Sequence, residues 1–511
     1  METTYAELYT RASQFASFFA QHSAPGSIVP LLVAKSADSV AAMIGAMMSG
    51  RAFCFVNPKY RGPQIAGILK ASRASLCLID PMGLVALRGS VSAVLDQSQT
   101  AWGLVGDREV GSLHAQTLAE LRARAIVHSV PKANDQTVPS GAGQNSEVGA
   151  CLFTSGSSGE PKGVLVTTED LVQRAIAEVE WFELSERDVL LSILPFSFDV
   201  GLNQLLSSLY VGAELVILNT WLAADMLSAT AARGVSGISG VPAIWQDLIR
   251  SGLRFDRSGA HRALRYVTVS GGSLPTPLLE QLRQVVDGAA IFKTYGQTEA
   301  FRTASLRPEE FGRKPDSVGR AFTGVRIYVV REDGTPCAPG EVGEIVHTGL
   351  GIMKGYLGNR ALSEGERRKL QPNPFYGPTD PSTMAVFTGD LGYLDNEGFL
   401  YLKGRRDGMV KIQGNRVYPQ EVTEQILCVP GVHDAVVVGY PAADGDGSLS
   451  AFVVPTRGTD LTLSYLRKEL SRRLPSYMVP QNMIFVKAIP RTATGKADIK
   501  PLLESLASNC G

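Results

Sequence analysis

The chain has 511 residues, more than one hydrophobic core usually supports, so two or more domains are expected. Its hydrophobic fraction of 44% and its charged fraction of 19% are those of an ordinary soluble globular protein. Lys and Arg total 49, and Asp and Glu total 49, so no net charge attracts the whole chain to nucleic acid or to an anionic membrane.

The first ninety or so residues alternate segments of helical periodicity with short apolar segments typical of buried strands. In chain order, the predicted helices and strands are residues 5–22, 27–34, 38–49, 54–56, 61–71 and 75–79. This alternation is typical of a parallel sheet covered by helices, which indicates the α/β class.

Cytoplasmic localisation is expected from two further features. The N-terminus lacks the basic start and apolar core of a signal peptide. The six cysteines are scattered, with no C-x-x-C pair and no histidine at metal-ligand spacing. That distribution fits a reducing compartment and argues against both a disulfide framework and a zinc site.

A loop rich in hydroxyl side chains and glycine follows an apolar segment at residues 148–153, and the polar residues 131–147 are expected to form an exposed connection to it. The loop contains Thr154, Ser155, Gly156, Ser157, Ser158, Gly159, Lys162 and Gly163. Its backbone N–H groups and hydroxyls could surround phosphate oxygens. It is not a Walker A sequence, and by itself it is equally consistent with a mobile linker.

A second alternating series is predicted at residues 189–194, 201–210, 214–218, 223–233, 237–239, 243–251 and 266–270. Residues 319–349 change to short strands with turn signals. Near the C-terminus, strands are predicted at residues 434–439, 448–454 and 483–487 and a helix at residues 463–474. We place a domain boundary near Asp407, which gives domains of residues 1–406 and 407–511.

Four further motifs follow the loop in order. They are Tyr295-Gly296-Gln297-Thr298-Glu299, Thr388-Gly389-Asp390-Leu391-Gly392, Gly404-Arg405-Arg406-Asp407 with Lys411-Ile412-Gln413-Gly414-Asn415-Arg416, and Pro490-Arg491-Thr492-Ala493-Thr494-Gly495-Lys496. Each motif alone is weak, but the ordered set is specific. Together with the loop, it resembles the adenylate-forming superfamily of acyl-CoA synthetases, luciferases and nonribosomal-peptide adenylation domains.

The resemblance covers nearly the whole chain. It implies a large N-terminal α/β domain of stacked sheets with flanking helices and a small β-barrel-like part, followed by a small mobile α+β C-terminal domain. Such enzymes use ATP and Mg²⁺ to convert a carboxylic acid to an acyl-adenylate and pyrophosphate, and most pass the acyl group to a phosphopantetheine thiol. With a pKa of roughly 4, the attacking carboxylate is already ionised near pH 7, so no general base is needed.

The resemblance also implies a nucleotide site. Besides the Ser/Gly loop, the implied nucleotide-binding residues are Gly271, Gly272, Ser273, Tyr295, Gly296, Asp390 and Arg405. Tyr295 would lie against adenine, and Asp390 would accept both ribose hydroxyls. Without the resemblance, Tyr295 reads as a core aromatic and Asp390 as a turn residue.

The implied catalytic residues are Lys496, Thr298 and Glu299. Lys496 would bridge the substrate carboxylate and the α-phosphate when the C-terminal domain closes, although most lysines are solvated surface residues. Thr298 would contact the α-phosphate, and Glu299 would hold Mg²⁺, a hard cation that prefers carboxylate oxygens.

Motion of the C-terminal domain is implied by the residues around the predicted boundary. Asp407 matches the hinge of the family, and a hinge is a short segment that absorbs large backbone changes. Lys411 and Gly414 would line the tunnel that admits the pantetheine thiol.

Asp199 is the residue that indicates the type of acid. Many fatty-acyl and aryl-CoA ligases have a histidine near this position, whereas an aspartate resembles the amino-acid-activating members, in which it pairs with the substrate ammonium group. An alternative is that Asp199 is a helix cap. The other implied pocket residues are Val200, Asn203, Ser239, Val269, Gly271, Thr294, Arg302 and Thr303.

Arg302 is unusual for an apolar-substrate pocket. One interpretation is that it recognises a second carboxylate or another polar group of the substrate. It could equally form an ion pair within the protein or contact the nucleotide. The sequence does not separate these alternatives.

The leading hypothesis is a stand-alone amino acid adenylation enzyme that serves a separate acyl or peptidyl carrier protein, as in nonribosomal peptide or polyketide biosynthesis. The nearest alternative is an acyl- or aryl-CoA ligase with CoA as the acceptor. A third is a nucleotide-binding protein without catalysis, against which the intact Lys496 motif argues. No nucleic acid or membrane partner is expected.

Overall fold

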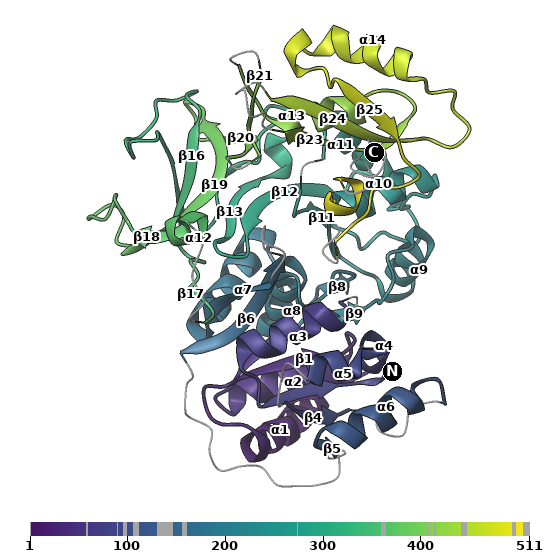
Figure 1. The fold of residues 1–511 in the computed structure, drawn as a ribbon, viewed down its shortest axis with the longest axis vertical. Helices are drawn as coiled ribbons and strands as arrows, with labels where there is room; N and C mark the ends of the chain where they lie inside the picture. Colours follow the sequence, from purple (N-terminus) through teal and green to yellow (C-terminus); the bar gives the residue numbers. More distant parts are fainter. Residues whose placement is uncertain are drawn as a thin grey trace. The chain divides into compact units, whose positions relative to one another are not determined.

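The computed structural model (Figure 1) describes residues 2–57, 60–88, 90–95, 100–105, 112–129, 147–155, 161–272, 274–358, 364–406, 408–412, 415–440, 447–492 and 497–503. The chain forms two compact units. The first comprises Met1–Ser239, Thr298–Phe301 and Leu350–Ser363, and the second comprises Gly240–Gln297, Arg302–Gly349 and Glu364–Gly511.

The first unit contains an eight-stranded sheet with the strand order β17-β7-β6-β2-β1-β3-β4-β5. Its strands are β1 (Ile28–Leu32), β2 (Ala52–Phe55), β3 (Leu76–Ile79), β4 (Ala101–Leu104), β5 (Val127–Ser129), β6 (Val148–Ser155), β7 (Pro161–Thr167) and β17 (Gly355–Tyr356). The pairings of β1 to β6 with one another are parallel, whereas β7 is antiparallel to β6 and to β17. The predicted parallel sheet is therefore confirmed.

Helices connect these strands. They are α1 (Tyr5–His22), α2 (Ala37–Met48), α3 (Gly62–Ser72), α4 (Pro81–Leu87), α5 (Val91–Leu95), α6 (Ser112–Arg124) and α7 (Thr168–Phe182). Helix α1 begins at a capping box, in which the Glu7 N–H donates to Thr4 Oγ1 at 3.2 Å and the Thr4 N–H donates to Glu7 Oε2 at 2.7 Å. The elements from α4 to β5 were not predicted.

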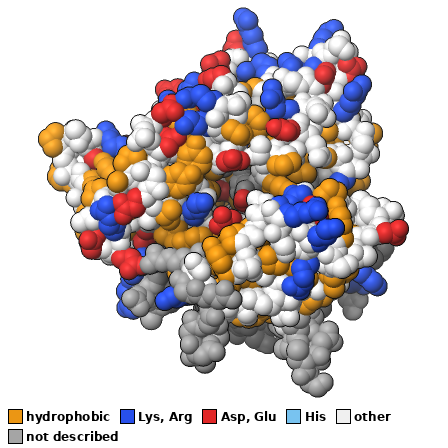
Figure 2. All heavy atoms as spheres, turned by 90° about the horizontal axis from the view of Figure 1, so that it is seen from above, with side chains coloured by type: hydrophobic (Ala, Val, Ile, Leu, Met, Phe, Trp, Pro, Cys, Tyr) orange, Lys and Arg blue, Asp and Glu red, His pale blue; other side chains and the backbone are white. Residues whose placement is uncertain are grey.

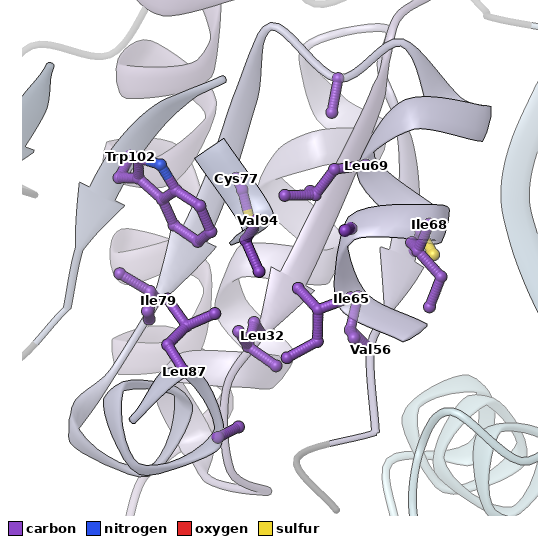
Figure 3. Close-up of a cluster of buried hydrophobic side chains, with 14 of the residues drawn as sticks. Leu32, Val56, Ile65, Ile68, Leu69, Cys77, Ile79, Leu87, Val94 and Trp102 are labelled. Atoms are coloured by element: carbon purple, nitrogen blue, oxygen red, sulfur yellow. The ribbon is translucent and has the colours of Figure 1, made fainter. Parts of the chain in front are cut away.

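The core of this sheet is a cluster of apolar side chains contributed by both strands and helices (Figure 3). Leu32 of β1, Ile79 of β3, Trp102 of β4 and Ile65 of α3 are all buried. Every residue of β1, β2 and β3 is buried, as expected for parallel strands that are covered on both faces.

A second parallel set in the first unit carries the segment that includes Asp199. It consists of β8 (Val189–Ser192), α8 (Asp199–Val211), β9 (Glu214–Ile217), α9 (Ala223–Arg233) and β10 (Gly237–Gly240). Strand β8 lies between β10 and β9 and pairs in parallel with both. The elements predicted between residues 189 and 239 are confirmed.

The second unit begins with α10 (Pro242–Ser251), β11 (Tyr266–Val269), α11 (Thr276–Val285), β12 (Ala290–Gln297), β13 (Phe301–Leu306), a 3₁₀ turn η2 (Pro308–Glu310) and β14 (Arg320–Ala321). Strands β11 and β12 pair in parallel, and β13 and β14 pair antiparallel.

An antiparallel sheet follows in the second unit, and its strands are β15 (Val325–Val330), β16 (Gly343–Gly349), β18 (Leu370–Pro372), β19 (Met384–Leu394) and β20 (Leu400–Arg405). Helix α12 (Glu364–Lys369) precedes β18. The order is β15-β16-β19-β18, with β20 paired to β19. Among the described residues no pairing closes these strands into a ring, so the expected β-barrel-like part is an open sheet.

The C-terminal elements are β21 (Val410–Ile412), β22 (Asn415–Val417), α13 (Pro419–Leu427), β23 (Val432–Tyr440), β24 (Ser448–Pro455), α14 (Leu463–Arg473), η3 (Ser476–Met478) and β25 (Asn482–Phe485). Strands β23, β24 and β25 form a sheet in that order. The predicted α+β character is confirmed. The predicted boundary at Asp407 falls on a residue outside the described ones and stays a prediction.

The surface carries both signs of charge. Figure 2 shows one face, on which Lys and Arg side chains are interspersed with Asp and Glu side chains. This mixture agrees with the equal numbers of acidic and basic residues. In the described part of the chain, no helix combines the length and the hydropathy needed to cross a bilayer.

Candidate active site

Asp390 is the centre of a half-buried polar cluster in the second unit. It lies in β19, and its side chain is 14% exposed. The Tyr295 hydroxyl donates to Asp390 Oδ2 at 2.6 Å. Burial and, next, the adjacent carboxylate raise the pKa of Tyr295 well above its ordinary value of 10, so the phenol stays a neutral donor. The alternative that Asp390 is a turn residue is wrong, because it is paired within a strand.

Arg405 reaches the same carboxylate from the neighbouring strand. Asp390 and Arg405 are directly opposite in the β19–β20 pairing, and Arg405 Nη1 lies 3.1 Å from Asp390 Oδ1. The resemblance assigned three residues of this cluster to the nucleotide, and the structure brings them together: Tyr295, Asp390 and Arg405.

Two residues that were not predicted extend this cluster. Gln297 Nε2 donates to Asp390 Oδ2 at 2.5 Å, and Lys369 Nζ donates to Gln297 Oε1 at 2.6 Å. Both side chains also donate to the Thr388 backbone oxygen, each at 3.0 Å. Gln297 belongs to a motif that could have identified it, whereas nothing in the sequence around Lys369 indicates this contact.

The turn assigned to adenine follows β11. Gly271 has a φ of +74°, a conformation that favours glycine. A Cβ atom on Gly272 would lie 3.2 Å from Pro242 Cγ, so the backbone approaches its neighbour closely there. Ser273 lies outside the described residues. A flat base could rest on such a turn, because two successive positions lack side chains.

The predicted phosphate loop connects two paired strands in the first unit. Thr154 in β6 is opposite Lys162 in β7, and Ser155 is the last residue of β6. Gly156, Ser157, Ser158 and Gly159 lie outside the described residues. The structure thus describes both strands that flank the loop and brings Lys162 beside Thr154.

Glu299 follows β12 and belongs to the first unit. The Tyr356 hydroxyl donates to Glu299 Oε1 at 2.8 Å, and the Met353 N–H donates to the Glu299 carbonyl oxygen at 3.0 Å. Thr298 and Glu299 are both half-buried, and Gly296 before them is exposed. A half-buried carboxylate fits Mg²⁺, which prefers oxygen ligands.

Asp199 is the first helical residue of α8. The N-cap is Phe198, so the alternative that Asp199 caps the helix is wrong by one position. Asp199 Oδ1 accepts the N–H of Val200 at 2.9 Å. A carboxylate in the first turn of a helix is favoured by the helix dipole.

Asn203 is one turn further along α8 and therefore on the same face as Asp199. It is 2% exposed, and its Oδ1 has no hydrogen-bond partner among the described residues. Two acceptor groups thus lie on one face of α8. Val200 on this helix and Ser239 in β10 are also buried.

The remaining predicted pocket residues are in the second unit. Val269 ends β11 and is buried. Arg302 is buried, and its Nη1 donates to Thr294 Oγ1 at 2.7 Å, so these two residues are brought together. Thr294 in turn lies 2.6 Å from the Ser270 hydroxyl. Thr303 lies instead 3.0 Å from His347 Nδ1, and both residues are fully buried.

The residues assigned to domain motion are described only in part. Lys411 is an exposed residue of β21, opposite Arg416 in β22. Asp407, Gly414 and Lys496 lie outside the described residues, so their assigned roles stay predictions.

Comparison with known proteins gives two matching families and a consistent set of relatives. AMP-binding enzymes match residues 1–357, and the AMP-binding enzyme C-terminal domain matches residues 421–496. The chain is 27% identical over 505 residues to tyrocidine synthase 3 of Brevibacillus parabrevis, and 27% identical over 514 residues to a dimodular nonribosomal peptide synthase of Bacillus subtilis. In each case 98% of the chain is aligned, but only 7% and 20% of the relatives' lengths.

The solved structures that match have the same fold over nearly the whole chain. ATP-bound MatB from Rhodopseudomonas palustris has a TM-score of 0.80 and 23% identity, with 99% of this chain and 94% of MatB covered. The o-succinylbenzoate coenzyme A synthetase of Bacillus subtilis, solved with ATP and a magnesium ion, has a TM-score of 0.78 and 25% identity, with 97% and 94% covered. On this fold and these matches, the chain belongs to the AMP-binding enzyme family, within the adenylate-forming superfamily.

Proposed function

We propose that this chain uses ATP to activate the carboxylate of an amino acid and then transfers the aminoacyl group to a phosphopantetheine thiol of a carrier protein. A carboxylate oxygen of the substrate forms a bond to the α-phosphorus, and pyrophosphate leaves. The thiol then replaces AMP at the carbonyl carbon. That the enzyme acts as a chain separate from its carrier protein stays a prediction.

The observation that carries the proposal is the pair of acceptor groups on α8. Asp199 supplies a carboxylate in the first helical turn, and Asn203 presents a buried amide oxygen one turn later. A buried acceptor is costly without a donor, and a substrate ammonium group carries three N–H donors. An acid without an amine would leave the buried amide oxygen of Asn203 without that donor.

The nucleotide would be held by the residues around Asp390. That carboxylate accepts hydroxyl donors, as its contact with Tyr295 illustrates, so it suits the two ribose hydroxyls. Lys162 and the flanking strands of the Ser/Gly loop would position the β- and γ-phosphates. Glu299 would hold Mg²⁺, which offsets the negative charge of the phosphates when it is bound.

Lys496 would neutralise the repulsion between the carboxylate and the α-phosphate. At an effective dielectric constant of about 20, two unit charges 4 Å apart attract by roughly 4 kcal/mol. An attraction of that size in the transition state corresponds to two to three powers of ten in rate, at about 1.36 kcal/mol for each.

The alternative function is a CoA ligase. It is supported by the structural neighbours, which include a coenzyme A synthetase and an anthranilate CoA ligase. The first half-reaction would be unchanged, and the thiol acceptor and the acid would differ.

ATP–pyrophosphate exchange across a panel of amino acids, fatty acids and aryl acids tests the proposal. We expect exchange with at least one amino acid and much slower exchange with the acids that lack an amine. Exchange only with amine-free acids would contradict amino acid activation and favour the CoA ligase. No exchange and no AMP formation with any acid would contradict both.

A further inference from the structure

A largely buried ion pair on α7 has no role in the function proposed above. Arg174 Nε lies 2.6 Å from Asp170 Oδ2, one turn earlier on the same helix. The two side chains are 1% and 14% exposed. Removing two charges from water is costly, and such pairs often add little net stability. The pair therefore calls for a reason other than stability.

Both charges are directed at one glycine. The Gly351 N–H donates to Asp170 Oδ1 at 3.1 Å, and Arg174 Nη2 donates to the Gly351 carbonyl oxygen at 2.9 Å. The planar guanidinium thus binds a carboxylate and a carbonyl at once, a geometry that lysine cannot reproduce. Because both polar groups of this peptide segment are bound, its orientation relative to α7 is fixed.

Phe301 packs against this arrangement. The Arg174 guanidinium lies over the Phe301 ring, with 5.2 Å from Cζ to the ring centroid. A Cβ atom on Gly351, where φ is +92°, would come within 2.6 Å of Phe301 Cβ. Phe301 itself has a φ of +50°, which is strained for a bulky residue and persists only when its surroundings hold it.

The same short segment also holds Glu299. Two residues after Gly351, the Met353 N–H donates to the Glu299 carbonyl oxygen, and the Tyr356 hydroxyl donates to the Glu299 carboxylate. Tyr356 is opposite Val164 in the pairing of β17 with β7, the strand that begins beside Lys162. One continuous set of contacts thus joins α7, the Glu299 turn and a strand that flanks the phosphate loop.

We propose that Asp170 and Arg174 are positioning residues for Glu299. They fix residues 351–356 and Phe301, and these residues fix both the backbone and the carboxylate of Glu299. Mutation of groups that orient a metal ligand typically lowers metal affinity by about 10- to 100-fold. The inference rests on the proposed function only for what Glu299 holds, a divalent cation beside the phosphates.

The test compares Arg174→Met and Tyr356→Phe with a matched control, Arg233→Met. Arg233 is an arginine on α9 of the same unit, ion-paired with Glu214, but 39% exposed. Two quantities are measured in the full-length enzyme. The first is hydrogen exchange of the Gly351 and Met353 amides without nucleotide or metal, and the second is the Mg²⁺ concentration that half-saturates ATP–pyrophosphate exchange.

We expect Arg174→Met to speed exchange of both amides by about 10-fold or more, since Asp170 and the Gly351 carbonyl lose the guanidinium that holds them together and the segment opens more readily. It should raise the half-saturating Mg²⁺ concentration by about 10-fold, within the range for partners of metal ligands. The amino acid KM should change less than about twofold. General destabilisation would instead change both the Mg²⁺ requirement and the amino acid KM. Tyr356→Phe should raise only the Mg²⁺ requirement, and Arg233→Met should change neither quantity.

Unchanged amide exchange in Arg174→Met, or an unchanged Mg²⁺ requirement together with faster exchange, would overturn the inference. If Arg174→Met does not fold, Asp170→Asn decides in the same way, because it removes the charge and keeps the shape. Glu299→Gln separates the proposed metal role of Glu299 from the role of the ion pair in ordering residues 351–356. If it leaves the Mg²⁺ requirement unchanged, the proposed metal role of Glu299 fails, whereas the amide exchange still decides whether the ion pair orders the segment.

Discussion

Asp390→Asn should weaken ATP binding selectively. The substitution keeps the side chain's shape and one acceptor oxygen, but it removes the charge and replaces the second oxygen by a donor. In the structure three donors converge on this carboxylate, from Tyr295, Gln297 and Arg405. An amide cannot accept from donors on both of its sides, so the geometry that would receive the ribose hydroxyls is disrupted.

The expected change in the KM for ATP depends on whether the ion pair with Arg405 or the hydrogen bonds to the nucleotide contribute more. Arg405 is 50% exposed, and an exposed ion pair contributes at most about 1 kcal/mol. A hydrogen bond to a charged group contributes about 1.5–3 kcal/mol, and Asp390 is only 14% exposed. The loss of the nucleotide contact therefore outweighs the loss of the ion pair. At 1.4 kcal/mol per factor of ten, the KM for ATP should rise by about 10- to 100-fold.

The assay is ATP–pyrophosphate exchange with ATP varied and the acid saturating. Asp395→Asn is the matched control, because Asp395 follows the same strand and is paired with Lys314 at 2.7 Å instead. We expect its KM for ATP to stay within about twofold of the wild-type value. A KM for ATP that changes less than twofold in Asp390→Asn, or equally in both variants, would refute the ribose assignment.

Three further predictions concern lysine and arginine side chains. Lys496→Ala should lower adenylate formation by two to three powers of ten while leaving thiol transfer from preformed adenylate largely intact; equal loss of both would contradict the assignment. Burial lowers the pKa of Lys35 from 10.5 to about 7, so between these values the unfolded chain binds more protons and stability rises with pH. The urea concentration at the unfolding midpoint should therefore increase between pH 7 and pH 9, and it should increase less in Lys35→Met. The same pH dependence in both proteins would contradict the lowered pKa of Lys35. If Arg302 binds a second carboxylate, Arg302→Gln should raise the KM more for acidic amino acids than for neutral ones; an equal effect on both would contradict that role and favour a structural one through contacts such as that with Thr294.

The fold was predictable where local signals agree with the tertiary structure. Helix α1 was predicted with its observed ends from its helical periodicity, and the capping box that the structure shows at Thr4 and Glu7 stabilises the same start. Strands β1 to β3 were identified from apolar runs. In contrast, α5 has five residues, too few to show a helical period.

The site was predictable only where a motif names its members. Tyr295, Asp390 and Arg405 come from three separate motifs, and the structure brings them together. Arg174 and Lys369 were missed because their contacts depend on the tertiary fold. Arg174 binds Gly351, 177 positions away, and Lys369 binds Gln297, 72 positions away. A single sequence contains no signal that pairs such distant residues.

The most direct test of amino acid activation compares one substrate amino acid with the same acid lacking its amine, in the wild-type enzyme, in Asp199→Ala and in Asp225→Ala. Asp225 is a matched control, since it is an aspartate in the first turn of α9. The account predicts that the wild-type enzyme and the control favour the amino acid in kcat/KM by about 10- to 100-fold, the value of a charged hydrogen bond, and that Asp199→Ala loses this preference. A wild-type enzyme that accepts both acids equally, or a preference that survives in Asp199→Ala, would contradict the account.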